Sequence, residues 1–396
     1  MIIYLTVFMI LLFPCIRYDI CAKKGGEGIW YQITLWTLIL LAAFRYRTGG
    51  DTLNYYDLFK DYPLISELGR FDFLGADYNP MWYVLNAFFR SFGNSFFLFQ
   101  LAEAIFVNVV IFRFFYRYCH YFFMAVLVYY FGYYFYFNME ILREIICICL
   151  FLIAYPFLEE KRYLPYFMVM ILALFFHTSA IAMLVAPIFM TLKRDRLGFS
   201  ILACLSISAI LFTFDIVGIL LSSVFGTEVN LVRQYLAIEQ PNLTGAILTF
   251  LIAVPFLMIF YLREKLDIHS DNKFGALLNF VVIIHSVAMF MRGPARLANY
   301  YMLIGVVFII NTLMDNWPKI RSSQYTTLLV MGTMFFYFFN LTFFYTKSKN
   351  TEVRGTHVYD RYIPYVSVFN PHVVDKREKL VINEHYRKDI ITLEKR

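Results

Sequence analysis

Apolar residues recur along this chain in runs of roughly 15–22 residues, separated by short polar segments. A helix that crosses a bilayer needs about 20 predominantly apolar residues, so these runs predict membrane spans. The predicted spans are residues 2–16, 29–44, 94–112, 121–137, 145–158, 164–177, 179–192, 199–222, 246–262, 275–291, 298–314 and 325–345. The first run has no basic flank before it and no small-residue cleavage site after it, so we interpret it as a retained span. The pattern predicts an all-α fold, a polytopic transmembrane helical bundle of about 12 spans.

Lysine and arginine in the short loops indicate the orientation of these spans. With twelve crossings, six basic loops fall on the same side of the membrane. They are residues 17–24, 113–120, 159–162, 193–196, 263–273 and 319–321. The positive-inside rule makes that side cytoplasmic. We therefore expect an integral membrane domain at 1–345 with an outer-face loop at 45–93, and a polar tail at 346–396 that lies outside.

Residues 80–92 are the one stretch that could add a crossing. They form a short run that includes Asn86 and Arg90, and a crossing there would invert every later loop. We interpret the stretch as an amphipathic helix that lies in the outer interface.

Composition agrees with a membrane protein and excludes several kinds of chemistry. Of the 396 residues, 60% are hydrophobic, 20% aromatic and only 16% charged, against about a quarter charged in soluble domains. There is no P-loop and no His-Glu-x-x-His motif, which argues against nucleotide hydrolysis and zinc-protease chemistry. No Asp-x-Asp pair is present to hold the metal of a sugar nucleotide. We expect no metal, no other cofactor and no nucleic-acid partner.

The most unusual polar segment begins where the second span ends, at residues 44–56 (FRYRTGGDTLNYY). Arginine beside an aromatic residue is a common interfacial anchor and accounts for Arg45 and Tyr46. It does not account for the glycine pair that is followed at once by Asp51, Thr52 and two tyrosines. The segment therefore indicates a folded polar site at the outer membrane boundary.

Two other arginines lie at the outer ends of predicted spans. Arg143 comes just before the span near 145, and Arg296 lies in the first turn of the span near 298. A helix amino terminus favours anions, and arginine binds phosphate or carboxylate with two donors. With Arg45 and Arg47 as further positive charge, we infer an anionic substrate at the outer leaflet, such as a lipid phosphate or pyrophosphate.

Simpler explanations stand beside each assignment. Arg45 and Arg90 can be interfacial anchors whose charge reaches for water. His177 can bond a turn carbonyl instead of acting in catalysis, and Asp51 can be a turn or cap residue. Tyrosines that could stack on sugar rings are equally explained by an aromatic belt. These tyrosines are Tyr55, Tyr56, Tyr362 and Tyr365.

The polar motifs together resemble the EpsG family, the Wzy-like polymerases of bacterial exopolysaccharide, capsule and O-antigen. The resemblance begins with residues 44–52 and Tyr55-Tyr56, and it extends through Asn138 and Arg143. It continues with residues 175–179 (FFHTS), 292–300 and 362–369 (YIPYVSVF), so it covers nearly the whole chain.

The resemblance implies a metal-independent inverting glycosyltransferase of GT-C-like architecture, with its active site at the outer, periplasmic face of the bacterial cytoplasmic membrane. Such an enzyme moves a glycan from undecaprenyl pyrophosphate to the terminal sugar of a lipid-linked repeat unit. A flippase and a chain-length regulator are the implied protein partners, and membrane lipid surrounds the enzyme.

The resemblance also implies roles for the matching residues. Arg143, with Arg292 or Arg296, would hold the pyrophosphate and stabilise the leaving group. His177 or Asp51 would be the base for the acceptor hydroxyl. The remaining matching positions would contribute to substrate binding. They are Arg45, Arg47, Thr52, Tyr55, Tyr56, Tyr300, Tyr362 and Tyr365.

Two other classes of membrane protein remain open. A lipid-linked oligosaccharide flippase would share the spans and the arginines, although it would be expected to show two related halves, and no internal repeat is detected. A membrane acyltransferase that modifies surface glycan would also use a histidine. Within the polymerase hypothesis, ligation of a finished glycan is a further possibility.

Overall fold

The computed structural model describes residues 1–192 except 74 and 94, residue 200, and residues 249–268, 274–288, 293–346 and 357–380. This described part of the chain is almost entirely helical and contains no strand. An isolated antiparallel bridge pairs Arg45 with Ser367. The all-α prediction is confirmed for these residues.

The chain divides into two compact units. The first contains residues 1–157, 164–178 and 341–396, and the second contains 158–163 and 179–340. The first unit thus joins the beginning of the chain to its end.

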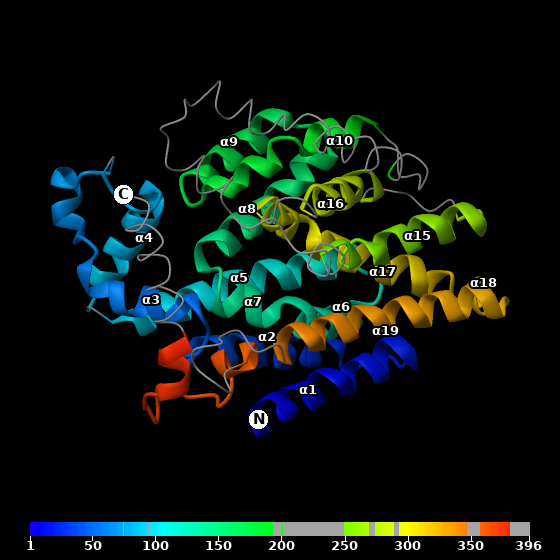
Figure 1. Cartoon of the computed structure of the whole chain (residues 1–396), viewed down its shortest axis with the longest axis horizontal. Coiled ribbons are helices and arrows are strands. Elements are labelled where there is room, and N and C mark those ends of the chain that lie inside the picture. The colour runs from blue at the N-terminus through cyan, green and yellow to red at the C-terminus, as the bar shows by residue number, and fades with distance from the viewer. Residues whose placement is uncertain are drawn as a thin grey trace. The chain divides into compact units, whose positions relative to one another are not determined.

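Helical passages build the first unit (Figure 1). They are α1 (Ile2–Pro14) continued by the π-helical η1 (Cys15–Ile20), α2 (Glu27–Ala43), α5 (Phe96–Tyr118), α6 (Phe122–Tyr129) continued by η4 (Tyr130–Tyr134) and α7 (Phe135–Met139), α8 (Leu142–Glu159) and α9 (Tyr163–Leu174). Between α2 and α5 lie short helices, each too short to cross a bilayer. These are α3 (Asp51–Leu58), η2 (Phe59–Asp61), η3 (Ile65–Arg70) and α4 (Pro80–Ser91).

Contacts between these passages show that they alternate in direction. The Tyr130 hydroxyl donates to the Tyr4 carbonyl at the start of α1, whereas the Asp19 carboxylate near the end of η1 accepts from the Met124 amide. The end of α2 lies beside the beginning of α5, because Gln100 in the second turn of α5 donates to the Ala43 carbonyl at 2.6 Å. One end of the unit therefore gathers residues 44–61, 138–143 and the tail 357–380, and we call it the tail end. The opposite end carries the predicted basic loops 17–24 and 113–120, and we call it the basic end.

The second unit consists of further apolar helices. They are the 3-10 segment η5 (Thr178–Met183), α10 (Ala186–Leu192), α15 (Val254–Lys265), α16 (Gly275–Ala288), the 3-10 segment η6 (Gly293–Ala298), α17 (Asn299–Asp315), α18 (Trp317–Arg321) and α19 (Gln324–Thr346). The last turns of α19, from Leu341, belong to the first unit.

Among the described residues, four helices are long and apolar enough to cross a membrane, namely Ile2–Ile20, Phe96–Tyr118, Arg296–Asp315 and Gln324–Thr346. Shorter apolar helices occur at Glu27–Ala43, Tyr163–Leu174, Thr178–Thr191 and Gly275–Ala288. Most predicted spans thus correspond to helices with ends shifted by a few residues, and the predicted span 199–222 lies outside the described residues apart from residue 200. The chain is a helical membrane protein; the number of about 12 spans stays a prediction.

The helix α4 occupies the stretch that could have added a crossing. Its 12 residues rise only about 18 Å, which is too short to span a bilayer. It buries one face through Trp82, Tyr83, Asn86 and Ala87. The amphipathic helix is therefore present, whereas its position in the outer interface stays a prediction.

Candidate functional site

The glycine pair after α2 sits directly against the segment that joins α7 to α8. Gly49 has a φ of +111°, and a Cβ there would collide with the Met139 carbonyl. A Cβ on Gly50 would collide with the carboxylate of Glu140. Gly49 therefore requires glycine, for its backbone conformation and for the close approach of the Met139 backbone, whereas a side chain at position 50 would displace the Glu140 carboxylate.

Glu140 connects this turn to the tail. Its carboxylate accepts hydrogen bonds from the Gly50 amide at 2.8 Å, from Arg361 at 3.0 Å and from the Tyr362 hydroxyl at 2.7 Å. The side chain is almost completely buried, and burial raises its pKa from the ordinary value of 4.5 despite the opposing charge of Arg361. Glu140 thus holds two segments, distant in sequence, on one carboxylate.

Arg143 lies in the first turn of α8 and faces two tyrosines. Its Nε donates to the Tyr55 hydroxyl at 3.1 Å, and its guanidinium carbon lies 4.2 Å from the centre of the Tyr78 ring. Burial raises the pKa of Tyr55 to about 12, although Arg143 acts against this rise. Among the described residues no carboxylate pairs with Arg143, so its two terminal nitrogens keep their donors. An arginine positioned on an aromatic ring at a helix amino terminus, with donors to spare, is suited to bind an anion.

Asp51 and Thr52 begin α3 beside this arginine. The Thr52 hydroxyl is buried and donates to the Met139 carbonyl at 2.7 Å, so it anchors the turn. The Asp51 side chain is exposed, and its charge acts on both Tyr55 and Tyr78. The structure therefore brings together Asp51, Tyr55, Tyr78 and Arg143, which we call the Arg143 cluster.

His177 follows α9 and is connected to the same region through the backbone. Its amide donates to the Ala173 carbonyl, which also accepts from the Cys147 thiol one turn after Arg143. The segment after Tyr78 bonds the end of α9 as well, because the Asn79 side chain donates to the Leu174 carbonyl. His177 is half-buried and is itself engaged in contacts, so the structure places it near the Arg143 cluster without assigning its role.

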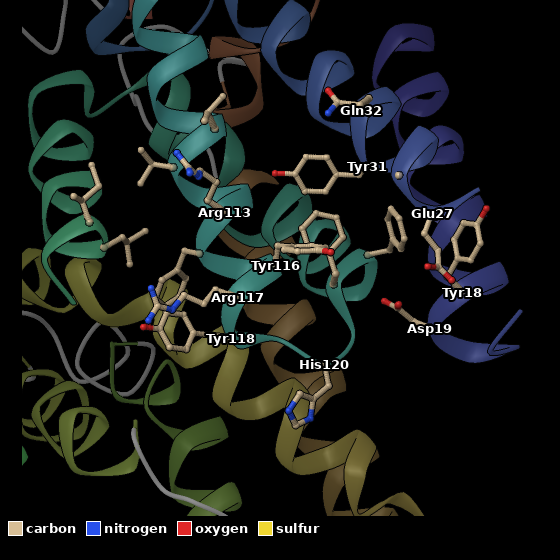
Figure 2. Close-up of a pocket in the computed structure, with 18 of the residues that line it drawn as sticks. Tyr18, Asp19, Glu27, Tyr31, Gln32, Arg113, Tyr116, Arg117, Tyr118 and His120 are labelled. Carbon is tan, nitrogen blue, oxygen red and sulfur yellow. The ribbon is translucent and has the colours of Figure 1, made fainter. Parts of the chain in front are cut away.

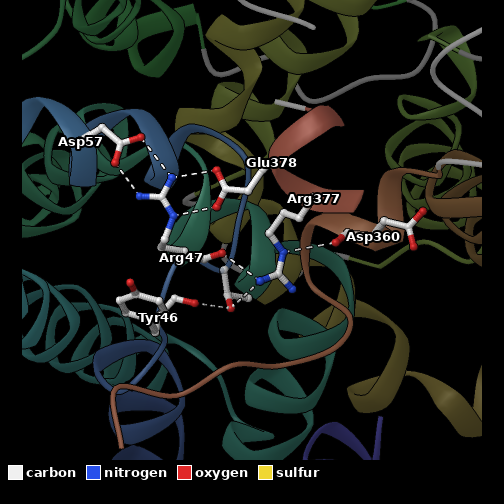
Figure 3. A network of polar contacts seen from close by, with 7 residues as sticks. Tyr46, Arg47, Asp57, Asp360, Arg377 and Glu378 are labelled. Atoms are coloured by element: carbon white, nitrogen blue, oxygen red, sulfur yellow. Dashed lines mark hydrogen bonds and ion pairs between the residues drawn. The ribbon is translucent and has the colours of Figure 1, made fainter. Parts of the chain in front are cut away.

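Arg47 is held by two acids at the tail end (Figure 3). It bonds Glu378 at 2.6 and 2.7 Å and Asp57 at 2.5 and 3.1 Å, and its guanidinium lies over the Tyr56 ring. These carboxylates raise the pKa of Arg47, so it remains charged. Its donors are directed to protein partners in this structure.

Arg45 is almost completely buried. Its guanidinium donates to the Ala42 carbonyl at 2.5 Å and lies 4.0 Å from the Glu103 carboxylate of α5. The interfacial anchor considered from the sequence does not describe this side chain, because an anchor reaches for water and Arg45 points into the protein. Substrate binding by Arg45 and Arg47 stays a prediction, while the contacts seen here position the turn.

The tail between residues 357 and 380 covers this turn. The buried Arg377 donates to the Arg47 carbonyl at 2.8 Å, to the Thr48 hydroxyl at 3.2 Å and to the Asp360 carbonyl at 3.3 Å (Figure 3). Neighbouring amides continue the contact, since Tyr46 donates to the Val366 carbonyl. Residues 357–380 are therefore packed into the fold of the first unit and do not form a separate extension.

The predicted sugar-stacking tyrosines of the tail are engaged in packing. Tyr362 is buried with its hydroxyl on Glu140, and Tyr365 donates to the Leu41 carbonyl at 3.0 Å while its ring meets Tyr4 edge to face. Their predicted contact with sugar is not tested by this arrangement.

The remaining predicted residues belong to the second unit. Arg296 is exposed in the 3-10 segment before α17 and has interactions of its own. Tyr300 is buried, and its hydroxyl lies 2.8 Å from that of Ser179. Arg292 lies outside the described residues.

Sequence reasoning missed Glu140, Tyr78 and Arg377. For Glu140 a signal existed, since an acid between two apolar segments is costly to bury and marks a functional or structural contact. Tyr78 and Arg377 lie in polar segments where nothing in the local pattern distinguishes them. Only the folded contacts identify these two.

Comparison with known proteins agrees with the polar motifs. No curated protein and no solved structure matches the chain. A family model described as the EpsG family matches residues 28–367, a range that includes the glycine turn, Arg143, His177 and the first part of the tail. Membership suggests a polymerase-type membrane protein of exopolysaccharide biosynthesis. The chain therefore belongs to the EpsG family.

Proposed function

We propose that this protein is a polysaccharide polymerase that transfers a glycan from an undecaprenyl-pyrophosphate donor to the terminal sugar of a lipid-linked repeat unit. The observation that carries the proposal is Arg143, which lies at the amino terminus of α8 with an exposed carboxylate, Asp51, in the same cluster and without an acidic partner among the described residues. The reaction takes place at the outer face of the bacterial cytoplasmic membrane.

Arg143 acts on the leaving group. When the bond between the anomeric carbon and the pyrophosphate oxygen breaks, negative charge develops on that oxygen. The two free terminal nitrogens of Arg143 and the amino end of α8 stabilise this charge, and the Tyr55 and Tyr78 contacts keep the guanidinium in place. Arg292 or Arg296 is proposed as a further ligand of the pyrophosphate.

The acceptor hydroxyl forms the new glycosidic bond. Its oxygen attacks the anomeric carbon from the side opposite the leaving pyrophosphate, so the configuration inverts, and its proton passes to a base. Asp51 and His177 are the two candidate bases. Thr52, Tyr55 and Tyr56 lie on the same helix as Asp51 and are proposed to contact the sugars.

The experiment compares surface glycan from cells that lack the protein and from cells complemented with wild type, Arg143→Ala, Arg143→Lys or Arg70→Ala. Arg70 is exposed in the same polar loop and serves as the matched control. We expect long chains with wild type and Arg70→Ala, and lipid-linked single repeats with Arg143→Ala. Loss of one stabilising donor group lowers such rates by about 10²–10³-fold, and Lys is expected to restore activity only in part.

The same cells distinguish the alternatives when the membrane side of the lipid-linked repeats and the acyl content of the glycan are also measured, provided that each variant reaches the membrane in normal amount. Repeats that accumulate on the cytoplasmic side would identify a flippase. Normal chain length with lost acyl groups would identify an acyltransferase. Full activity of Arg143→Ala would remove the main support for the proposed mechanism.

A further inference from the structure

A large cavity of about 1140 Å³ opens in the first unit at its basic end (Figure 2). It is enclosed by η1, the first turns of α2, the last turns of α5, the start of α6 and the second half of α8. Along α8, the lining residues Leu152, Ile153 and Pro156 lie about 14–20 Å beyond Arg143. The cavity is therefore separate from the proposed active site.

Charges of opposite sign line two sides of this cavity (Figure 2). Arg113 and Arg117 extend from successive turns of α5, whereas Asp19 and Glu27 come from η1 and α2 on the other side. Asp19 already accepts a hydrogen bond from the Met124 amide at 2.6 Å. Arg113, Arg117 and Glu27 have no ion-pair partner in the part of the chain that the structure describes, although all three line one cavity.

Aromatic rings lie between the two charged sides. The Tyr31 ring stacks on Phe122 at 5.2 Å and meets Tyr116 edge to face at 5.7 Å. Figure 2 shows the Tyr31 hydroxyl on the side of Arg113. The cavity thus offers an apolar floor with a basic wall and an acidic wall.

The position of the cavity indicates how deep in the bilayer its ligand lies. It is formed where two candidate membrane spans, Ile2–Ile20 and Phe96–Tyr118, come to an end. Tyrosine and arginine at the ends of spans occupy the headgroup region of a bilayer. The volume exceeds the roughly 300–1,000 Å³ of small-molecule pockets, so a headgroup and the first part of its acyl chains can enter together.

We propose that this cavity binds a phospholipid with a zwitterionic, primary-amine headgroup, of the phosphoethanolamine type. Arg113 and Arg117 bind the phosphate, and Glu27 with Asp19 accepts hydrogen bonds from the ammonium group. A purely anionic lipid would meet the same arginines but would be repelled by the two acids. A quaternary amine would keep the charge but has no hydrogen to donate.

The test measures lipid retention by the purified full-length protein after reconstitution in vesicles with equal amounts of phosphatidylethanolamine, phosphatidylcholine and phosphatidylglycerol. We expect wild type to retain phosphatidylethanolamine above the other two. Soluble phosphoethanolamine is added as a competitor in a second arm. Displacement by this soluble compound would show that the headgroup alone supplies the binding, and lack of displacement would show that the acyl chains are needed as well.

Variants separate the two walls of the cavity. Arg113→Ala with Arg117→Ala is expected to lower retention of all three lipids, by about fivefold for each lost charge. Glu27→Gln is expected to lower the preference for phosphatidylethanolamine over phosphatidylglycerol by about fivefold, without lowering retention of phosphatidylglycerol. Arg162→Ala, an exposed arginine of another predicted basic loop, is the matched control and should change neither quantity.

Two outcomes would overturn the proposal. One is wild-type retention of phosphatidylglycerol equal to or above that of phosphatidylethanolamine, which needs no variant to be interpreted. The other is retention of all three lipids at the wild-type amount in the double arginine variant. Either result would leave a polypeptide segment of mixed charge as the alternative occupant.

Discussion

At the scale of single residues, the conformation of the turn at Gly49-Gly50 is set by its contacts with Met139 and Glu140. Gly49 adopts a left-handed conformation, and both glycines pack against the segment Met139-Glu140. A side chain at either position would displace that segment, which directly precedes Arg143. The geometry of the turn and that of the proposed site are therefore linked.

Gly49→Ala is expected to lower the stability of the protein by about 2 kcal/mol, because it adds both backbone strain and a collision with the Met139 carbonyl. Thermal unfolding in detergent measures the loss. Gly69→Ala is the matched control, since a Cβ there meets nothing within 4 Å. Equal melting temperatures for the two variants would contradict this account of the turn.

Glu140 should make stability depend on pH in a specific direction. Because burial raises its pKa above 4.5, the folded protein keeps a proton that the unfolded chain releases once the pH exceeds about 4.5. Wild type should therefore lose thermal stability relative to Glu140→Gln as the pH rises from about 4.5 towards neutrality. A difference between the two proteins that is constant over this range, or that grows in favour of wild type, would show that the pKa is not raised.

At the scale of elements, the tail acts as a clamp on the turn after α2. Arg377 bonds the backbone or hydroxyl of Arg47, Thr48 and Asp360, and Glu378 pairs with Arg47. A buried guanidinium makes these contacts selective, because no smaller side chain reaches all of them.

Arg377→Ala is expected to release the tail and to lower stability by about 3 kcal/mol, since hydrogen bonds of a charged group are lost in a buried position. Limited proteolysis between residues 357 and 380 should become faster, and glycan chains should become shorter. Lys379→Ala, at an exposed neighbouring position, should leave proteolysis unchanged. Wild-type protection of the tail in Arg377→Ala would mean that other contacts hold it.

At the scale of the whole molecule, the first unit places chemically different groups at its two ends. The tail end carries the Arg143 cluster, and the basic end carries the loops rich in lysine and arginine. The positive-inside rule then predicts that the tail end faces outward.

Thiol labelling of whole cells tests this orientation. Cys21 at the basic end is exposed, whereas Cys15, Cys119, Cys147 and Cys149 are buried. With Cys204 replaced by Ser, a membrane-impermeant maleimide should label Cys21 only after the membrane is permeabilised.

Lys60→Cys adds an exposed thiol at the tail end and should be labelled in intact cells. Labelling of Cys21 but not of Lys60→Cys in intact cells would reverse the orientation and place the proposed site on the cytoplasmic side.

The sequence by itself determined the class of the protein and the positions of most helices. Runs of apolar residues predict helices because every backbone group in a bilayer must be bonded within the segment. Helix α4 could be distinguished from a span by its length and its polar residues. Arg143 could be identified because it immediately precedes an apolar run, and the short motifs indicated the EpsG family.

Only the tertiary structure decided which arginines pair with a carboxylate. Arg45, Arg47 and Arg143 look alike in the sequence, since each adjoins an apolar span. Pairing with Glu103, Asp57 and Glu378 depends on contacts between segments up to 331 residues apart, which local pattern does not encode. A charged side chain becomes a structural contact or a candidate ligand according to the partners that folding brings within a few ångströms, and those partners exist only in the folded chain.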